Sequence, residues 1–353
     1  MARVLFISKT GNGSAGYWRP FSGMANSIGY VVELLREQGH DAEAVTVADN
    51  NVIDREVTAY QPTHCVIEAL WVVPEKFPIL RSLHPTVRWC VRLHSELPFL
   101  QMEGVATEWL WGYAAQGLTI APNSRRTVED LRRLLSIRYP HRADRIVAWL
   151  PNAYPLRELD RPPPAPRPED GELHLGVFGA VRPLKNLLIQ AAAAVVFADE
   201  IRRVCVLHVN ADRVEQNGDP VLKNVRGLFA GLAPHRLEEH AWADRDAFMA
   251  LLARLDVVTQ VSLTESFNLV CADAVATGVP VVASPEVRWL PSWCQADPTD
   301  RAQMVAKLRH VWAGRPDGLH LINRDYLRAY VQRAGEAWWS WLNALPVPAV
   351  PAG

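Results

Sequence analysis

Apolar and polar positions alternate along the chain in the way that is typical of a sheet covered by helices. Short apolar runs, each long enough for one buried strand, are separated by segments in which apolar residues return every three or four positions. Because strand and helix signals follow one another in turn, the pattern predicts a parallel β-sheet and an α/β fold. The predicted strands lie at residues 4–8, 42–47, 64–70, 87–94 and 118–122, and the predicted helices at 22–38, 103–116 and 125–137.

A proline-rich segment interrupts this alternation. Residues 157–171 hold five prolines and almost no apolar side chains, which is typical of a stiff, extended linker. A second alternating series follows, and a final helix carries Trp338, Trp339 and Trp341. We therefore predict two Rossmann-like domains. The predicted bounds are 1–155 for the N-terminal domain, 156–171 for the linker, 172–324 for the C-terminal domain, and 325–353 for a terminal helix and its tail.

The composition limits the classes of function. A chain of 353 residues exceeds one ordinary hydrophobic core and suits two domains. Its net charge of −1 argues against a protein that is held to its partner mainly by bulk positive charge. The five cysteines occur singly, without a C-x-x-C pair, as in a reducing compartment. No apolar run approaches the roughly 18 residues that span a bilayer, and the first run is typical of a strand rather than a signal peptide. We expect a cytoplasmic protein.

The segment 255–284 holds the strongest candidate chemistry. Its pattern predicts a buried strand, a polar turn, a short apolar helix that begins at Ser266 or Phe267, and a second buried strand. The first N–H groups of such a helix have no internal partner and lie at the positive end of its dipole, where phosphate binds well. Glu265 lies beside this position, and Asp273 follows about 12 Å further along the axis. That span suits a nucleoside diphosphate sugar, with the hexose at one carboxylate and the ribose at the other.

This segment resembles the sugar-nucleotide signature of retaining glycosyltransferases with the GT-B fold, in the group 1 or glycogen-synthase-like superfamily that contains sucrose- and mannosyl-transferring enzymes. The family pattern is Glu-x-Phe-Gly, four further residues, and Glu-Ala-x-Ala-x-Gly-x-Pro-Val-Val-Ala. The chain departs from it at Asn268, where the family has Gly, and at Asp273, where the family has Glu. It matches the pattern at Glu265, Phe267, Ala274, Ala276, Gly278, Pro280, Val281, Val282 and Ala283.

The resemblance implies an α/β fold of the GT-B type, with two Rossmann-like domains whose parallel sheets face a central cleft. The N-terminal domain would bind the acceptor and the C-terminal domain the nucleotide-sugar donor, and the terminal helix would pack back on the N-terminal domain. Arg182 and Lys185, in the loop after Gly179, occupy the place where the family neutralises the donor diphosphate. His94, at the end of a predicted strand, occupies the place of a histidine that faces the donor sugar.

The implied activity is retaining transfer of a hexose from a nucleoside diphosphate sugar, with a UDP-sugar as the expected donor, to an acceptor hydroxyl. Charge on the leaving diphosphate would be stabilised by the cations and the helix amides, so no metal and no other cofactor is expected. The predicted catalytic residues are His94, Arg182, Lys185 and Glu265. The predicted donor-binding residues are Gly13, Gly179, Ser266, Phe267, Asn268, Leu269 and Asp273.

Two other functions fit parts of the sequence. Gly11-x-Gly13-x-x-Gly16 follows the first predicted strand, as in the NAD(P)-binding domains of oxidoreductases. Tyr17, Trp18, Arg19 and Pro20 intervene between Gly16 and the proposed helix start near Ser22, which predicts a long loop rather than a tight phosphate turn. The second alternative is a non-catalytic binding protein of the same fold. Asp244 and Asp246 are typical of a helix N-cap rather than of a metal site.

The acceptor is left open by the sequence between a saccharide and DNA. Residues 125–145 carry seven arginines against three acids, and the basic helix predicted there could contact phosphate or be a solvated helix. The segment VRLHSELPF resembles glycosyltransferases of bacterial viruses, some of which modify hydroxymethylated DNA bases, which would place the protein in the host cytoplasm. The predicted DNA contacts are Arg125, Arg126, Arg132 and Arg133. The oligomeric state is not predicted.

Overall fold

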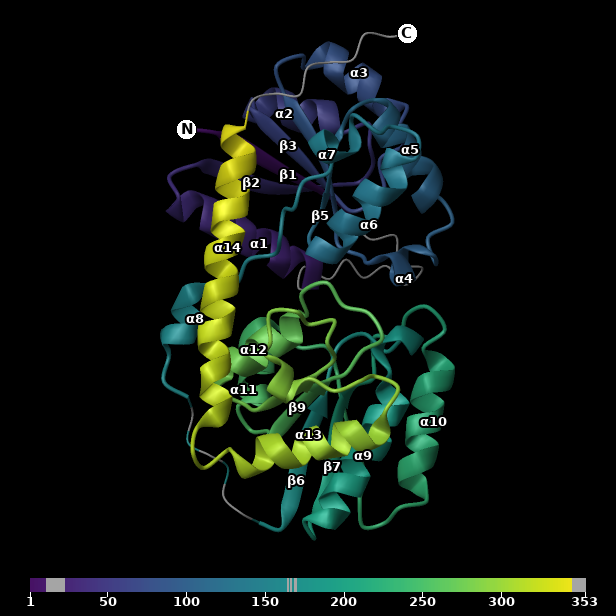
Figure 1. Ribbon diagram of the computed structural model, residues 1–353, viewed down its shortest axis with the longest axis vertical. Helices are drawn as coiled ribbons and strands as arrows, with labels where there is room; N and C mark the ends of the chain where they lie inside the picture. The colour runs from purple at the N-terminus through teal and green to yellow at the C-terminus, as the bar shows by residue number, and fades with distance from the viewer. Residues whose placement is uncertain (11–22, 164, 166, 168–169, 345–353) are drawn as a thin grey trace. The chain divides into compact units, whose positions relative to one another are not determined.

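The computed structural model describes residues 1–10, 23–163, 165, 167 and 170–344 (Figure 1). The chain divides into two compact units. The first unit consists of Met1–Pro155 and Val331–Gly353, and the second unit consists of Leu156–Tyr330. Each unit has its own parallel five-stranded sheet, so each is described separately.

The sheet of the first unit has the order β2-β1-β3-β4-β5, and every neighbouring pair is parallel. Two of its strands contain fully buried apolar runs, since Val4–Ile7 and Cys65–Ile67 are 0% exposed. The strands are β1 (Arg3–Lys9), β2 (Asp41–Val47), β3 (His64–Glu68), β4 (Arg88–Leu93) and β5 (Thr119–Pro122). The helices are α1 (Gly23–Glu37), α2 (Ile53–Tyr60), α3 (Lys76–Leu83), α4 (Leu97–Leu100), α5 (Ala106–Ala115), α6 (Arg125–Ser136) and α7 (Ala143–Ile146).

The sheet of the second unit has the order β10-β9-β6-β7-β8, again with parallel neighbours throughout. Its strands are β6 (Glu172–Val177), β7 (Val204–Asn210), β8 (Arg236–His240), β9 (Val257–Gln260) and β10 (Val281–Ala283). Its helices are α8 (Leu156–Asp160), α9 (Leu187–Glu200), α10 (Asp219–Ala230), α11 (Arg245–Leu252), α12 (Leu269–Thr277) and α13 (Arg301–Ala313), with short 3-10 turns η1 (Pro183–Lys185), η2 (Ser292–Cys294) and η3 (Leu319–Ile322).

Two predicted element bounds are wrong. The helix of the signature segment begins at Leu269 rather than at Ser266 or Phe267, because Asn268 is its N-cap and accepts the Cys271 N–H. The proline-rich segment is not extended from its start, because Leu156–Asp160 forms α8 before the first proline of the run. In both places the sequence offered polar residues that fit a loop and a helix end equally well.

The terminal helix α14 (Asn323–Asn343) contributes its last turns to the first unit. Trp338 is fully buried there: its ring lies 5.6 Å from that of Phe6, and its Nε1–H donates to the Pro151 carbonyl at 2.9 Å. Trp341 is also buried, with its ring 5.0 Å from that of His64, whereas Trp339 is 50% exposed. Two of the three tryptophans therefore belong to the core of the first unit.

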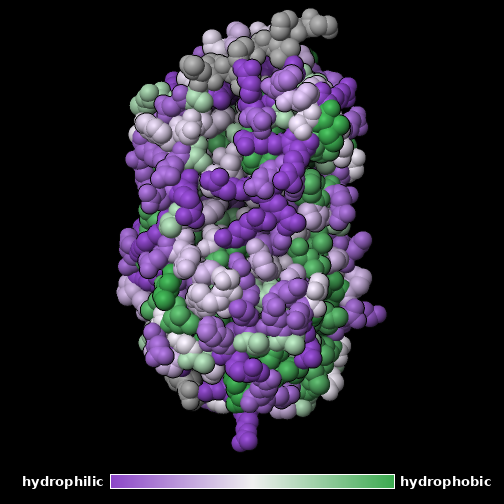
Figure 2. All heavy atoms as spheres, in the orientation of Figure 1, coloured by the Kyte–Doolittle hydropathy of each residue, from purple (hydrophilic) through white to green (hydrophobic). Residues whose placement is uncertain are grey.

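Hydrophilic side chains cover much of the face drawn in Figure 2, with apolar side chains between them. Among the described helices, none is both long enough and apolar enough to cross a membrane.

Candidate active site

The strand order of the second sheet changes direction beside β6, and this change positions the candidate site. β6 has β7 on one side and β9 on the other. In open parallel sheets, ligands bind outside the carboxyl ends of the strands at such a point. The loop after β6 carries Lys185 and the loop after β9 carries Glu265. The two side chains form an ion pair and are only 17% and 10% exposed, so two residues predicted to bind one ligand lie together.

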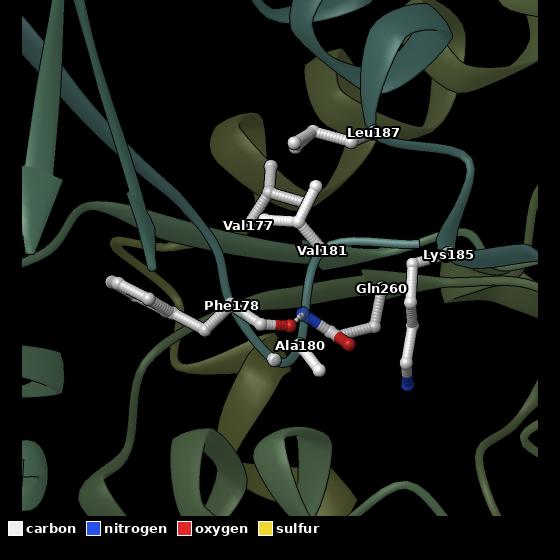
Figure 3. Close-up of a pocket in the computed structure, with 8 residues that line it drawn as sticks. Val177, Phe178, Ala180, Val181, Lys185, Leu187 and Gln260 are labelled. Atoms are coloured by element: carbon white, nitrogen blue, oxygen red, sulfur yellow. Dashed lines mark hydrogen bonds between the residues drawn. The ribbon is translucent and has the colours of Figure 1, made fainter. Parts of the chain in front are cut away.

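The loop that carries Lys185 begins after β6 with the peptide group between Phe178 and Gly179, and both the carbonyl and the N–H of this peptide are hydrogen-bonded. Gln260 Nε2 donates to the Phe178 carbonyl at 3.0 Å, and the Gly179 N–H donates to Asn210 Oδ1 at 3.0 Å. Gly179 has a φ of 115°, a conformation that strains any side chain. Figure 3 shows the Gln260 amide close to this turn, with Lys185 beside it. The direction of the loop is therefore fixed by the two neighbouring strands and by glycine.

Gln260 and Asn210 were not among the predicted site residues. Each is the last residue of its strand, and they are 1% and 5% exposed. Buried polar side chains need hydrogen-bond partners, and at the carboxyl end of a strand those partners lie in the site loops. A polar residue that ends an apolar strand is the sequence signal that could have identified them.

Asn268, a predicted donor contact, uses its side chain inside the protein. Its Oδ1 accepts the Cys271 N–H at 2.9 Å, and its Nδ2 donates to Gln260 Oε1 at 2.9 Å. The residue is 7% exposed and has a φ of 62°, a conformation that asparagine tolerates better than most residues. The departure from the glycine of the family pattern therefore adds a tie between α12 and the Phe178 carbonyl.

The remaining residues at the start of α12 divide into buried and accessible ones. Phe267 is 1% exposed and lies against Tyr330 at a ring separation of 5.0 Å, and its carbonyl accepts Trp289 Nε1–H at 2.7 Å. Its side chain anchors the loop in the core. Ser266 and Leu269 are half-buried at the helix start, where the first helical amides have no partner within the helix. These two predicted donor contacts are thus partly accessible, as is the neighbouring Val270.

Arg182 lies in the same loop as Lys185 but faces another acid. Its Nη1 is 3.6 Å from Glu215 Oε2, and Arg213 Nε donates to Glu215 Oε1 at 2.7 Å. Arg213 also lies over the ring of Trp242, 4.5 Å from its centroid. These contacts place two guanidinium groups around one carboxylate at the carboxyl ends of β6 and β7.

Asp273, the predicted ribose contact, is buried in an ion pair. Its Oδ1 accepts Arg245 Nη1–H at 2.7 Å, and the two side chains are 5% and 21% exposed. Because α12 begins at Leu269, Asp273 lies only about 6 Å along the axis from the first helical residue. Arg245 was not among the predicted site residues, since only the packing of α11 against α12 brings it to Asp273.

In the first unit, His94 follows β4, and its Nε2 is hydrogen-bonded to Oε2 of Glu68, the last residue of β3. Arg92 Nη1 lies 3.2 Å from both Glu68 oxygens, and its Nη2 donates to Asn152 Oδ1 at 2.6 Å. Burial raises the pKa of Glu68, but Arg92 and His94 outweigh this effect and hold its pKa below the usual value. An ionised Glu68 thus orients the imidazole of His94, whose contact with the donor sugar stays a prediction.

The basic residues of α6 have mixed surroundings. The Arg125 guanidinium lies 3.9 Å from the ring centroid of Trp149, and Arg132 donates to the Val147 carbonyl at 2.9 Å. Arg125 and Arg133 are exposed, and Arg126 is half-buried. Arg132 therefore has a structural role within the first unit, and Arg125 and Arg133 are the more accessible of the predicted DNA contacts. Gly13 and the motif Gly11-x-Gly13-x-x-Gly16 lie outside the described residues.

One group of potential metal ligands occurs in the described part of the chain, at the amino end of β6. Ligand atoms of Asp170, Glu172 and His174 all lie within 4.8 Å of one another. Both Glu172 oxygens are held by Arg236, at 2.6 and 2.8 Å, and Asp170 pairs with Arg167. These arginines neutralise the carboxylates, and the group lies at the end of β6 opposite to the loop of Lys185.

Comparison with known protein families finds a match over part of the chain. Residues 129–287 match the model of the family described as family 4 glycosyltransferases in conflict systems. None of the curated proteins matches the chain.

Solved structures resemble the chain along nearly its whole length. A UDP-forming α,α-trehalose-phosphate synthase from Burkholderia vietnamiensis has a TM-score of 0.69 at 14% identity, over 98% of this chain and 97% of that one. The sucrose-phosphate synthase of Thermosynechococcus elongatus has a TM-score of 0.66 at 14% identity, over 97% and 98%. A glycosyltransferase from Rickettsia africae has a TM-score of 0.66 at 11% identity, over 96% and 98%.

At these identities, the likeness to solved structures establishes the fold, and the family match covers the part of the chain that carries the Lys185–Glu265 pair and α12. The predicted α/β architecture of the GT-B type is confirmed. The protein is a glycosyltransferase of the GT-B fold, similar over residues 129–287 to the family 4 glycosyltransferases in conflict systems.

Proposed function

We propose that the protein transfers a sugar from a nucleoside diphosphate sugar, with UDP as the expected nucleotide, to an acceptor hydroxyl with retention of the anomeric configuration. The observation that carries this proposal is the Lys185–Glu265 ion pair beside the start of α12, at the change of strand order. One structural relative is a UDP-forming synthase, which supports the choice of nucleotide.

The start of α12 and the loop after β6 supply the positive charge that a diphosphate needs. The amides of Leu269 and Val270 have no partner within the helix, and the helix dipole adds to their positive potential. Lys185 stands beside them and Arg182 belongs to the same loop. As the glycosidic bond breaks, these fixed groups would stabilise the charge on the leaving phosphate, so we propose that no metal ion is required.

The pairing of Lys185 with Glu265 explains how both charges persist in a mostly buried site. Each neutralises the other in the free protein, because an unpaired buried charge is strongly destabilising. A bound donor offers each a replacement: the phosphate for the lysine, and sugar hydroxyls for the carboxylate. Glu265 would then hold the sugar, while the acceptor hydroxyl attacks from the side of the leaving phosphate, which takes the proton.

The donor site can be tested with purified protein and a panel of UDP-, GDP-, ADP- and TDP-sugars. We expect one donor to release its nucleoside diphosphate, in the presence of EDTA as well as in its absence. Lys185→Ala should lower kcat/KM by about 10² to 10³, since it removes a group that stabilises the leaving charge, and Glu265→Gln should do likewise by loosening the sugar. The exposed Lys223 of α10 offers the matched control Lys223→Ala, with unchanged activity.

Full activity of Lys185→Ala and Glu265→Gln would show that the site is elsewhere. Binding of NAD in place of every nucleoside diphosphate would favour the oxidoreductase alternative, and nucleotide binding without turnover would favour a non-catalytic binding protein. The configuration of the product, read by NMR, decides between retention and inversion.

For the acceptor, we propose a hydroxymethylated base in DNA. The family description refers to conflict systems, and the exposed Arg125 and Arg133 lie on one helix of the first unit. Arginine contacts to DNA phosphate make affinity fall steeply with salt. The donor reaction, supplied with hydroxymethylated and unmodified duplexes, tests this idea. Transfer to a small saccharide but to neither duplex would contradict it.

A further inference from the structure

Asp273 and Arg245 form a fixed pair at the side of α12. The carboxylate is 5% exposed, and its Oδ1 accepts a guanidinium N–H at 2.7 Å. Arg245 is the first residue of α11, whose N-cap is Asp244, and α11 packs against α12. Since a buried carboxylate that loses its cation is strongly destabilising, the guanidinium is part of this position whether or not a ligand is present.

The place of this pair follows from the proposed function, on which the present inference rests. If the donor diphosphate lies at the amides of Leu269 and Val270, Asp273 is about 6 Å further along the helix axis. That distance is close to the separation between a phosphate and the ribose that carries it. The Arg245–Asp273 pair therefore lies at the nucleoside end of the donor.

The pair presents a different chemistry from that of a lone carboxylate. An ionised carboxylate only accepts hydrogen bonds, so it would read the hydroxyls of a ribose. Here the carboxylate already accepts from a guanidinium, and the more exposed member of the pair is Arg245, which only donates. A guanidinium is satisfied by any ribose oxygen, including the ring oxygen and the 3′ oxygen, and does not need the 2′-hydroxyl.

A site rejects an analogue that lacks a hydroxyl when its own buried group is left without a partner. In this protein Asp273 keeps Arg245 as its partner when the 2′-hydroxyl is missing. We propose that Arg245 contacts the nucleoside end of the donor, that Asp273 positions Arg245 rather than reading the ribose, and that the site accepts 2′-deoxyribonucleoside diphosphates about as well as the ribonucleotides.

Calorimetric titration of the protein with UDP and 2′-deoxy-UDP tests this proposal, with the guanine and adenine pairs measured beside them. For the base that binds best, we expect the two dissociation constants to agree within about threefold. A preference for the ribonucleotide above about tenfold would overturn the inference and leave the proposed function intact. A tenfold preference corresponds to about 1.4 kcal/mol, which is roughly the discrimination that one good hydrogen bond provides. Absence of binding by every nucleoside diphosphate would contradict the proposed function itself.

Two variants test the roles within the pair. Arg245→Gln frees the Asp273 carboxylate to accept from the ribose, so the preference for UDP over 2′-deoxy-UDP should rise to about tenfold. Asp273→Glu should raise the same ratio by extending the carboxylate past the guanidinium. Because this second variant keeps the ion pair, it still tests the assignment if Arg245→Gln fails to fold. A purely structural pair would change both dissociation constants together, and an unchanged ratio in folded protein would overturn the assignment.

Arg226 offers a matched control in the same unit. It pairs with Glu239 through bonds of 2.6 and 2.7 Å, but its side chain is 54% exposed. Arg226→Gln should leave both dissociation constants, and their ratio, at the wild-type values. A change of the ratio in this variant would show that loss of any arginine from the unit alters the measurement, and the inference would fail.

Discussion

At the scale of single residues, the site depends on side chains that hold the backbone of the loops. Asn268 caps α12 and ties it to Gln260, which in turn holds the Phe178 carbonyl. The amide opposite that carbonyl, at Gly179, is held by Asn210. None of these polar contacts needs a ligand. The loop with Lys185 is therefore arranged before a donor arrives, and binding does not have to order it.

Asn268→Gly separates the effect on the loop from the effect on stability. Glycine relieves the positive φ but loses the cap, and these opposing terms should keep the change in unfolding free energy within about 1 kcal/mol. The affinity for the nucleoside diphosphate should fall severalfold, because Gln260 loses the partner that aims its amide. Thermal melting and calorimetry measure the two quantities. An affinity equal to wild type would contradict the role of this tie.

At the scale of elements, three strands of the second unit share a chain of imidazoles. His174 Nδ1 lies 2.9 Å from His208 Nε2, and His208 Nδ1 lies 2.8 Å from His240 Nε2. Burial, with the neighbouring histidines and the Arg254 and Arg236 charges, lowers the pKa of His208 to about 3. Burial also lowers the pKa of His240, against the opposing effect of Glu238.

This row of three histidines should make the stability of the second unit sensitive to acid. Because the folded-state pKa of His208 lies below its unfolded value of 6.5, the unfolded state binds the proton first. Stability is therefore unaffected above about pH 6.5 and is lost as the pH falls from there toward about 3, by about 1.4 kcal/mol per pH unit for one such group. His208→Gln should reduce the fall in melting temperature between pH 7 and pH 5.

The exposed His310 of α13 provides the control, since His310→Gln should keep the wild-type dependence on pH. An equal loss of melting temperature in wild type and His208→Gln would show that other groups dominate the acid response. Carboxylates also titrate in this range, but they contribute equally in the wild type and in the variants. Their effect on the melting temperature therefore cancels in the comparison.

The sequence predicted elements better than it predicted partners. The series of strands and helices, and the segment with Glu265, could be predicted because each follows from a local pattern of residues in the sequence. The partners of the site residues do not, because they are distant in sequence: Arg245 is 28 positions from Asp273, and Glu68 is 26 positions from His94. Likewise, the three imidazoles come from different strands. The packing of α11 against α12 brings Arg245 to Asp273, and the parallel register of the sheets aligns the histidines, and no local sequence pattern encodes either arrangement.

At the scale of the whole molecule, the core of the first unit depends on the last helix of the chain. Trp338 is fully buried against Phe6 and also donates to the Pro151 carbonyl. Trp338→Ala should lower the unfolding free energy of the first unit by about 3 to 5 kcal/mol, through lost apolar burial and a cavity. Trp339→Ala, at a position that is 50% exposed, is the matched control. Equal destabilisation by both, in urea titrations, would contradict this role.

The division of the chain into units also sets an order of events during synthesis. The first unit takes residues from both ends of the polypeptide, Met1–Pro155 and Val331–Gly353, with the whole second unit encoded between them. A ribosome must therefore finish the second unit before the first has its last helix. We expect a nascent chain that stops at residue 330 to leave the place of Trp338 open to protease, and the protein to complete its N-terminal half last.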